Sequence, residues 1–192
     1  MNLYLLYERR LTLKMFNRIL YRTRQFLHII SSRYTKNDQA FARKYLTLEE
    51  MALFSKLPVF EQKHSVKTAK SMLRYIHGKN LDERKVAKIG LLHDIGKSLI
   101  RLSVLDKILM VVIRAFKEDW YDYLAKMGES EKSPKFFRRF FVHKHHDALG
   151  EKLLSNLPVD KEVAHIVGRH TAKPHKDDAF LLNLLKKADT EY

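Results

Sequence analysis

The sequence predicts an all-α protein, and three observations lead to that class. Glycine and proline are scarce, at 6 and 4 of the 192 residues, and such a composition favours helices over turn-rich β folds. Hydrophobic residues make up 45% and charged residues 31%, which is typical of a globular chain and too apolar for a disordered one. Apolar residues recur at helical spacing, and no stretch of useful length alternates like a half-buried strand. We therefore expect a compact helical fold.

Residues 1–45 are predicted to form a basic, amphipathic, helical N-terminal extension, and residues 46–192 a helical domain that follows it. Arginines lie largely off the apolar stripe of this extension. Such a helix packs its stripe on the main domain, or it binds a membrane surface or nucleic acid. The side chains that form the stripe are Phe16, Ile19, Leu20, Thr23, Phe26, Leu27 and Ile30.

Capping and breaking residues predict the helices of the second part in order. Residues 47–50, TLEE, match the capping box that opens a helix, and Pro58 ends that helix. The next helix is predicted over residues 60–77, and Asn80 is predicted to cap the one after it. The remaining helices are predicted at 103–116, 136–143, 146–156, 160–170 and 178–190, with a looser helix and a loop between 117 and 135.

The composition also limits the possible functions and the cellular location of the protein. The chain has no cysteine, which excludes disulfides, thiolate metal sites and a cysteine nucleophile, and we expect a reducing, cytoplasmic location. No apolar run approaches the ~18 residues that span a bilayer, and the N-terminus does not resemble a cleaved signal peptide. The formal net charge of +15 favours anionic partners, such as phosphorylated small molecules, nucleic acid or a membrane surface.

Histidines and aspartates stand at helix ends, or within helices, that otherwise look buried. In the stretch GLLHDIGK, His93 and Asp94 directly follow an apolar run, and a buried carboxylate is costly unless it is paired or binds a metal. Imidazole and carboxylate ligands suit Zn, Fe, Mn and similar divalent ions. A carboxylate can bridge two such ions, which then act together on a phosphoryl group. The candidate ligands are His64, His93, Asp94, His146, His170 and Asp189.

The order of these residues resembles a known signature. His64, the His93-Asp94 pair and Asp189 look like the H…HD…D pattern of the HD-domain metal-dependent phosphohydrolases, and HDIGK resembles the HDIG variant of that pattern. The segment HHDALGEKLL is similar to the HPxxGAxxL segment of members with two metals, and IVGRH is similar to the segment of their next ligand histidine. The resemblance covers about residues 45 to 192.

The resemblance implies a role for each matching residue. His64, His93, Asp94 and Asp189 would bind the first of two divalent ions, and Asp94 would bridge to the second. His146 and His170 would complete the second site. Asp94 and Lys97 would be the catalytic residues, with Lys97 facing the substrate phosphate as a positive charge. The alternative for Lys97 is a solvated lysine beyond Gly96.

Some positions depart from the family pattern. Asp147 stands where proline is usual, and Thr171 follows His170 where a second histidine is usual. The extra signature of the cyclic-dinucleotide phosphodiesterases of the GYP subgroup is missing, which puts that substrate in doubt.

Two neighbouring histidines leave the assignment of one ligand open. His143 and His145 lie close to His146 in the sequence, so either could take its place. We choose His146 because Gly150 and Leu154 follow it at the spacing of the family.

The resemblance implies that the chain hydrolyses a phosphate ester or anhydride, expected to be part of a nucleotide, by attack of a metal-bound hydroxide. Two alternatives remain open. Some relatives with the same ligand set are di-iron oxygenases, which need iron and consume O₂. A basic helical module that binds nucleic acid or a membrane surface through residues 1–45 would need neither metal nor turnover, and its binding would weaken with salt.

Overall fold

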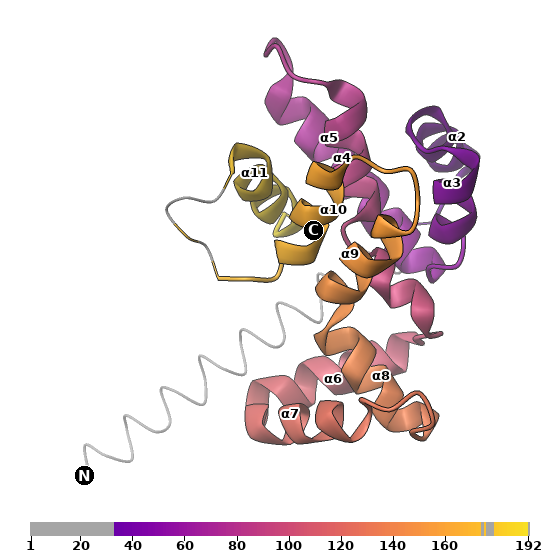
Figure 1. Cartoon of the computed structure of the whole chain (residues 1–192), viewed down its shortest axis with the longest axis vertical. Helices are drawn as coiled ribbons and strands as arrows, with labels where there is room; N and C mark the ends of the chain where they lie inside the picture. The colour runs from indigo at the N-terminus through magenta and orange to yellow at the C-terminus, as the bar shows by residue number, and fades with distance from the viewer. Residues whose placement is uncertain (1–32, 174, 176–178, 192) are drawn as a thin grey trace.

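A computed structural model describes residues 33–173, 175 and 179–191, and the stripe predicted over residues 16–30 lies outside this range. Within the described residues the chain forms ten α-helices, one 3₁₀ helix and no strand, which confirms the all-α prediction (Figure 1). The α-helices are α2 (Lys36–Tyr45), α3 (Leu48–Phe54), α4 (Val59–Ile76), α5 (Glu83–Leu92), α6 (Val104–Phe116), α7 (Glu118–Met127), α8 (Lys135–Lys144), α9 (His146–Ser155), α10 (Lys161–Arg169) and α11 (Phe180–Asp189). The 3₁₀ helix is η1 (Ile95–Leu99).

Side-chain caps begin several of these helices. The capping box predicted for residues 47–50 is confirmed, because Thr47 and Glu50 each bond the backbone N–H of the other. The cap predicted at Asn80 is wrong. Asp82 caps α5 instead, since its carboxylate accepts hydrogen bonds from the backbone N–H groups of Arg84 and Lys85.

The segment between residues 117 and 135 contains the predicted helix and loop. The helix, α7, is regular rather than loose, and it follows α6 after a single residue, Lys117. Gly128 then packs against the start of α8, where an added Cβ would lie 2.1 Å from the carbonyl oxygen of Phe137. This close approach ties the loop after α7 to α8.

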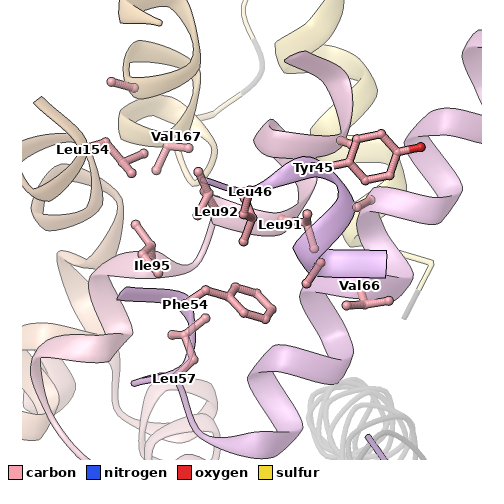
Figure 2. Packing of buried hydrophobic residues seen from close by; sticks show 14 residues of the cluster. Tyr45, Leu46, Phe54, Leu57, Val66, Leu91, Leu92, Ile95, Leu154 and Val167 are labelled. Carbon is pink, nitrogen blue, oxygen red and sulfur yellow. The ribbon is translucent and has the colours of Figure 1, made fainter. Parts of the chain in front are cut away.

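The main hydrophobic core joins elements that are distant in the sequence. Its buried side chains come from α2, α3, α4, α5, η1, α9, α10 and the turns that follow α2 and α3. Figure 2 draws this cluster, with Phe54, Leu91 and Ile95 among the labelled side chains. Helix α2 contributes Ala42 and Tyr45, both buried. Residues before 46 therefore take part in this core, while the domain boundary at residue 45 stays a prediction.

The helices α6, α7 and α8 lie together at one end of the molecule (Figure 1). They share a smaller core of Met110, Tyr121, Ala125 and Phe140, which Leu102, just before α6, completes. None of the helices in the described part of the chain is long and apolar enough to cross a membrane.

Two glycines allow the elements that carry His93 and Asp94 to approach their neighbours closely. A Cβ on Gly90 of α5 would lie 2.5 Å from the Cα of Ala69 in α4. A Cβ on Gly96 of η1 would lie 2.0 Å from the carbonyl oxygen of His146 at the start of α9. Both distances are far shorter than any real contact, so only glycine permits this packing.

We predict that Gly96→Ala destabilises the fold, because the methyl group meets backbone atoms that cannot rotate away. Overpacking of this kind costs about 1–3 kcal/mol, which urea unfolding followed by circular dichroism would measure. The control is Gly78→Asn. Gly78 has a φ of 77°, an added Cβ there meets nothing within 4 Å, and asparagine tolerates that backbone conformation. Equal stabilities of the two variants would contradict the packing argument.

Candidate metal centre

Six side chains meet where several helix ends converge. His93 and His170 each follow directly on the last residue of a helix, and His146 begins one. Asp94 precedes η1, Asp189 is the last residue of α11, and His64 lies within α4. The structure thus brings together all the candidate ligands that the sequence analysis names, while their binding of metal stays a prediction.

Asp94 lies between two pairs of histidines. Its Oδ1 atom is 3.1 Å from Nε2 of His146 and 3.7 Å from Nε2 of His170. Its Oδ2 atom is 3.4 Å from Nε2 of His93 and 3.9 Å from Nε2 of His64. Each oxygen of this buried carboxylate therefore faces a histidine pair of its own, as a bridging ligand would.

Asp189 supplies a second carboxylate to one of these pairs. Its Oδ1 atom is 2.7 Å from Nε2 of His64 and 3.2 Å from Nε2 of His93. The ligand atoms of His64, His93 and Asp189 all lie within 4.8 Å of one another, and the same holds for His93, Asp94 and His170. Both sets have the spacing that a single ion needs.

Backbone carbonyls orient three of the imidazole rings. The Nδ1 atom of His93 is 2.9 Å from the carbonyl oxygen of Gly90. The Nδ1 atom of His146 is 2.8 Å from that of His143, and the Nδ1 atom of His170 is 2.7 Å from that of Val167. A carbonyl oxygen only accepts, so each Nδ1 donates its hydrogen, and each neutral ring keeps a lone pair on Nε2. This is how proteins orient histidines that bind metal.

The Nε2 lone pairs of these rings favour a cation between them. The Nε2 atoms of His146 and His170 face each other at 3.2 Å, which is repulsive for two neutral rings unless a proton or metal ion lies between them. The pKa of His146 is lowered by burial and by the nearby Lys97 ammonium, which disfavours the proton. The Nε2 atom of His93 is buried and lies 3.4 Å from Oδ2 of Asp94 and 3.2 Å from Oδ1 of Asp189. This donor set therefore fits divalent ions.

The surrounding charges keep both carboxylates ionised. Burial raises the pKa of Asp94, but Lys97 and His93 outweigh it and hold that pKa well below its usual range. Burial also raises the pKa of Asp189, but hydrogen bonding to His64 and His93 outweighs burial and holds that pKa well below its usual range. Burial lowers the pKa of His93, but Asp94 and Asp189 raise it to about 10. The centre thus favours positive charge at His93, as a site that binds cations would.

Lys97 is not a solvated lysine, so that alternative is wrong. Its side chain is buried, with Nζ 2.6 Å from Oδ2 of Asp94 and 3.5 Å from Oε2 of Glu61. Burial lowers the pKa of Lys97, but Asp94 and Glu61 outweigh it and raise that pKa. The side chain thus points at the centre, while its contact with a substrate phosphate stays a prediction.

The two histidines that compete with His146 have other partners. Nδ1 of His143 lies 2.6 Å from the hydroxyl oxygen of Tyr121. The ring of His145 packs on that of Phe141, with centroids 4.8 Å apart. Of the three, only His146 has a ring nitrogen within 4.0 Å of the Asp94 carboxylate in the described structure, with Nε2 3.1 Å from Oδ1, which favours the choice made from the sequence.

The two positions that depart from the family pattern contact each other. The hydroxyl of Thr171 donates a hydrogen bond to the carboxylate of Asp147. This bond links the first turn of α9 to the residues just after α10, beside His146 and His170. Asp147 and Thr171 therefore join the start of α9 to the end of α10.

Sequence reasoning missed Glu61. This residue is fully buried on α4, three positions before His64, and its Oε1 atom is 2.6 Å from Nζ of Lys107. The available signal was the spacing, because residues three apart share one face of a helix.

We predict that divalent ions stabilise the chain. An ion at about 100 times its Kd adds about 2.7 kcal/mol, which is roughly 5–10 °C in Tm for a chain of this size. Thermal unfolding of the metal-free chain with added Mn²⁺ or Zn²⁺ measures this. Asp94→Asn should abolish the shift. His165→Ala should keep it, because His165 is exposed and its ion pair among the described residues is with Glu151, at 3.6 Å. If no added ion raises the Tm of the wild-type chain, the prediction of a metal site is wrong.

The comparisons with known proteins agree with this geometry. The family model for the HD domain matches residues 62–191, a range that includes all six candidate ligands. No curated protein matches the chain, and no solved structure does. The chain belongs to the HD-domain family, which points to the metal-dependent phosphohydrolases in general.

Proposed function

We propose that this protein hydrolyses a phosphate ester or anhydride of a small anionic substrate, which we expect to be a nucleotide. The observation that carries the proposal is the position of Asp94. Each oxygen of its carboxylate faces a separate pair of histidine Nε2 atoms. Such an arrangement suits two ions that share one ligand, and a pair of ions is a common device for phosphoryl transfer.

The proposed ligand sets are those that the family resemblance implies, and the distances around Asp94 and Asp189 support them. His64, His93, Asp94 and Asp189 would hold one ion, and Asp94, His146 and His170 the other. Two divalent ions so held would polarise the phosphoryl oxygens and activate a water molecule. The identity of the ions stays open among Fe, Mn, Zn and similar metals, because imidazole and carboxylate accept all of them.

The overall reaction adds water to phosphorus and breaks the bond from phosphorus to the leaving oxygen. One proton of the water remains with the phosphate product or the solvent, and the other is needed by the leaving group. Nζ of Lys97 lies 2.6 Å from Oδ2 of Asp94, so we assign to Lys97 the stabilisation of the charge that develops on the phosphoryl oxygens. The net charge of +15 would favour the approach of an anionic substrate.

We predict about two ions per chain after loading with Mn²⁺, and hydrolysis of a phosphate ester or anhydride in a panel of nucleotides and simple phosphate esters. Asp94→Asn should lose both ions and turnover, because it alone contacts both histidine pairs. His146→Ala should retain about one ion. Elemental analysis and phosphate release under anaerobic conditions are the measurements.

The competing functions give different results in the same assays. Consumption of O₂ by the iron-loaded chain, with no phosphate released from any substrate, would replace the proposal with an oxygenase. A chain that binds no ion, and binds nucleic acid or vesicles equally well after Asp94→Asn, would replace it with a binding module.

We predict that Lys97→Met lowers kcat/KM by about 10²-fold, as the loss of one preorganised electrostatic group does, while the ions remain bound. The matched control is Lys88→Met. Lys88 also pairs with a buried carboxylate, 2.6 Å from Glu50, but it takes no part in the centre. A loss of activity that is equal in the two variants would argue that Lys97 only supports the fold.

A further inference from the structure

Four charges of alternating sign form a row that starts at the centre and leads to α6. They are Asp94, Lys97, Glu61 and Lys107, with nitrogen-to-oxygen distances of 2.6, 3.5 and 2.6 Å along the row. Asp94, Lys97 and Glu61 are buried. Lys97 lies between two carboxylates, and only one of them belongs to the candidate ligands.

The position of Lys97 conflicts with metal binding at the same atom. Its Nζ atom contacts Oδ2 of Asp94, which is also the oxygen that faces His93 and His64. A divalent ion on these ligands would compete with the ammonium for one oxygen and repel it at short range. A buried ammonium that loses its carboxylate is strongly destabilising. Lys97 therefore needs another acceptor when Asp94 binds an ion.

Glu61 offers that acceptor. Its Oε1 atom is 2.6 Å from Nζ of Lys107. Its Oε2 atom is buried, makes no hydrogen bond within the described residues, and lies 3.5 Å from Nζ of Lys97. Burial raises the pKa of Glu61, but Lys107 and Lys97 outweigh it, so the carboxylate remains charged. One oxygen is thus held by Lys107, and the other is left for Lys97.

We infer that Glu61 is a positioning residue that takes over the Lys97 ammonium when Asp94 binds metal. The inference rests on the proposed metal centre and assigns to it a residue outside the ligand set. Glu61 keeps Lys97 paired and beside the centre in the loaded state, and it frees Oδ2 of Asp94 for the ion.

A purely structural role for Glu61 makes a different prediction. Glu61 also joins α4 to α6 through Lys107, and Met110 is the one buried residue of α6. If Glu61 only held α6 in place, its loss would affect metal binding in the same way whether or not Lys97 were present. The experiment therefore removes Glu61 with and without Lys97.

The first test measures the Kd of Mn²⁺ alone for the metal-free full chain by isothermal titration calorimetry. Glu61→Gln should weaken binding about 10- to 100-fold, the usual effect of losing a group that supports a ligand. In the Lys97→Met chain the same substitution should cost at most about threefold, which is what one lost charge at a distance is worth. An equal loss in both chains would overturn the inference.

The matched control is Glu50→Gln. Glu50 is also buried and also binds a lysine at 2.6 Å, but it lies away from the centre. It should leave the Kd unchanged. If Glu50→Gln weakens binding as much as Glu61→Gln does, the effect reflects general destabilisation and the inference is wrong.

The second test needs no metal, so it separates this inference from the proposed function. Asp94→Asn, Glu61→Gln and the double variant are compared by thermal unfolding of the metal-free chain. Because Lys97 keeps one carboxylate in each single variant and none in the double, the drop in Tm of the double variant should exceed the sum of the single drops by roughly 4 °C or more. Additive drops would overturn the inference. If the wild-type chain does not bind Mn²⁺ but the excess is still present, the proposed function and the metal-linked transfer are both wrong, and Glu61 remains only as a second acceptor for Lys97.

Discussion

Asp94 is a carboxylate buried at the junction of α5 and η1, and the surrounding structure must compensate its negative charge. Isolated burial of this charge would be very unfavourable, so positive or cation-binding groups must contact both of its oxygens. Lys97 and His93 contact one side, and His146 and His170 the other. The helix ends that carry these groups come from distant parts of the sequence, and the approach of η1 to α9 at Gly96 brings them within reach.

The carboxylates around the centre outnumber the lysines. The carboxylates are Asp94, Asp189 and Glu61, and the lysines are Lys97 and Lys107. These residues alone leave an excess of one negative charge. In the metal-free chain the raised pKa of His93, about 10, corresponds to a proton that supplies the missing charge. Glu61 would allow Lys97 to remain when ions replace this proton.

Much of the fold and of the centre could be predicted from the sequence, because both leave local signals. Helical spacing and the capping box at Thr47 are local, and so is the His93-Asp94 pair at the end of an apolar run. The ion pair of Glu61 with Lys107 could not be predicted, because it joins residues 46 positions apart and neither position matches a motif. Helix α2 was not separated from the extension that precedes it, since its contribution to the core depends on tertiary packing against α4 and α5.

The central claim is that Asp94 joins two ions, and anomalous diffraction from crystals of the Mn²⁺-loaded chain tests it most directly. The account predicts two anomalous peaks about 3.5–4 Å apart. Oδ2 of Asp94 would contact the ion shared with His64, His93 and Asp189, and Oδ1 would contact the ion shared with His146 and His170. Peaks that lie elsewhere, with Asp94 still paired to Lys97 and its histidines free of metal, would contradict the account.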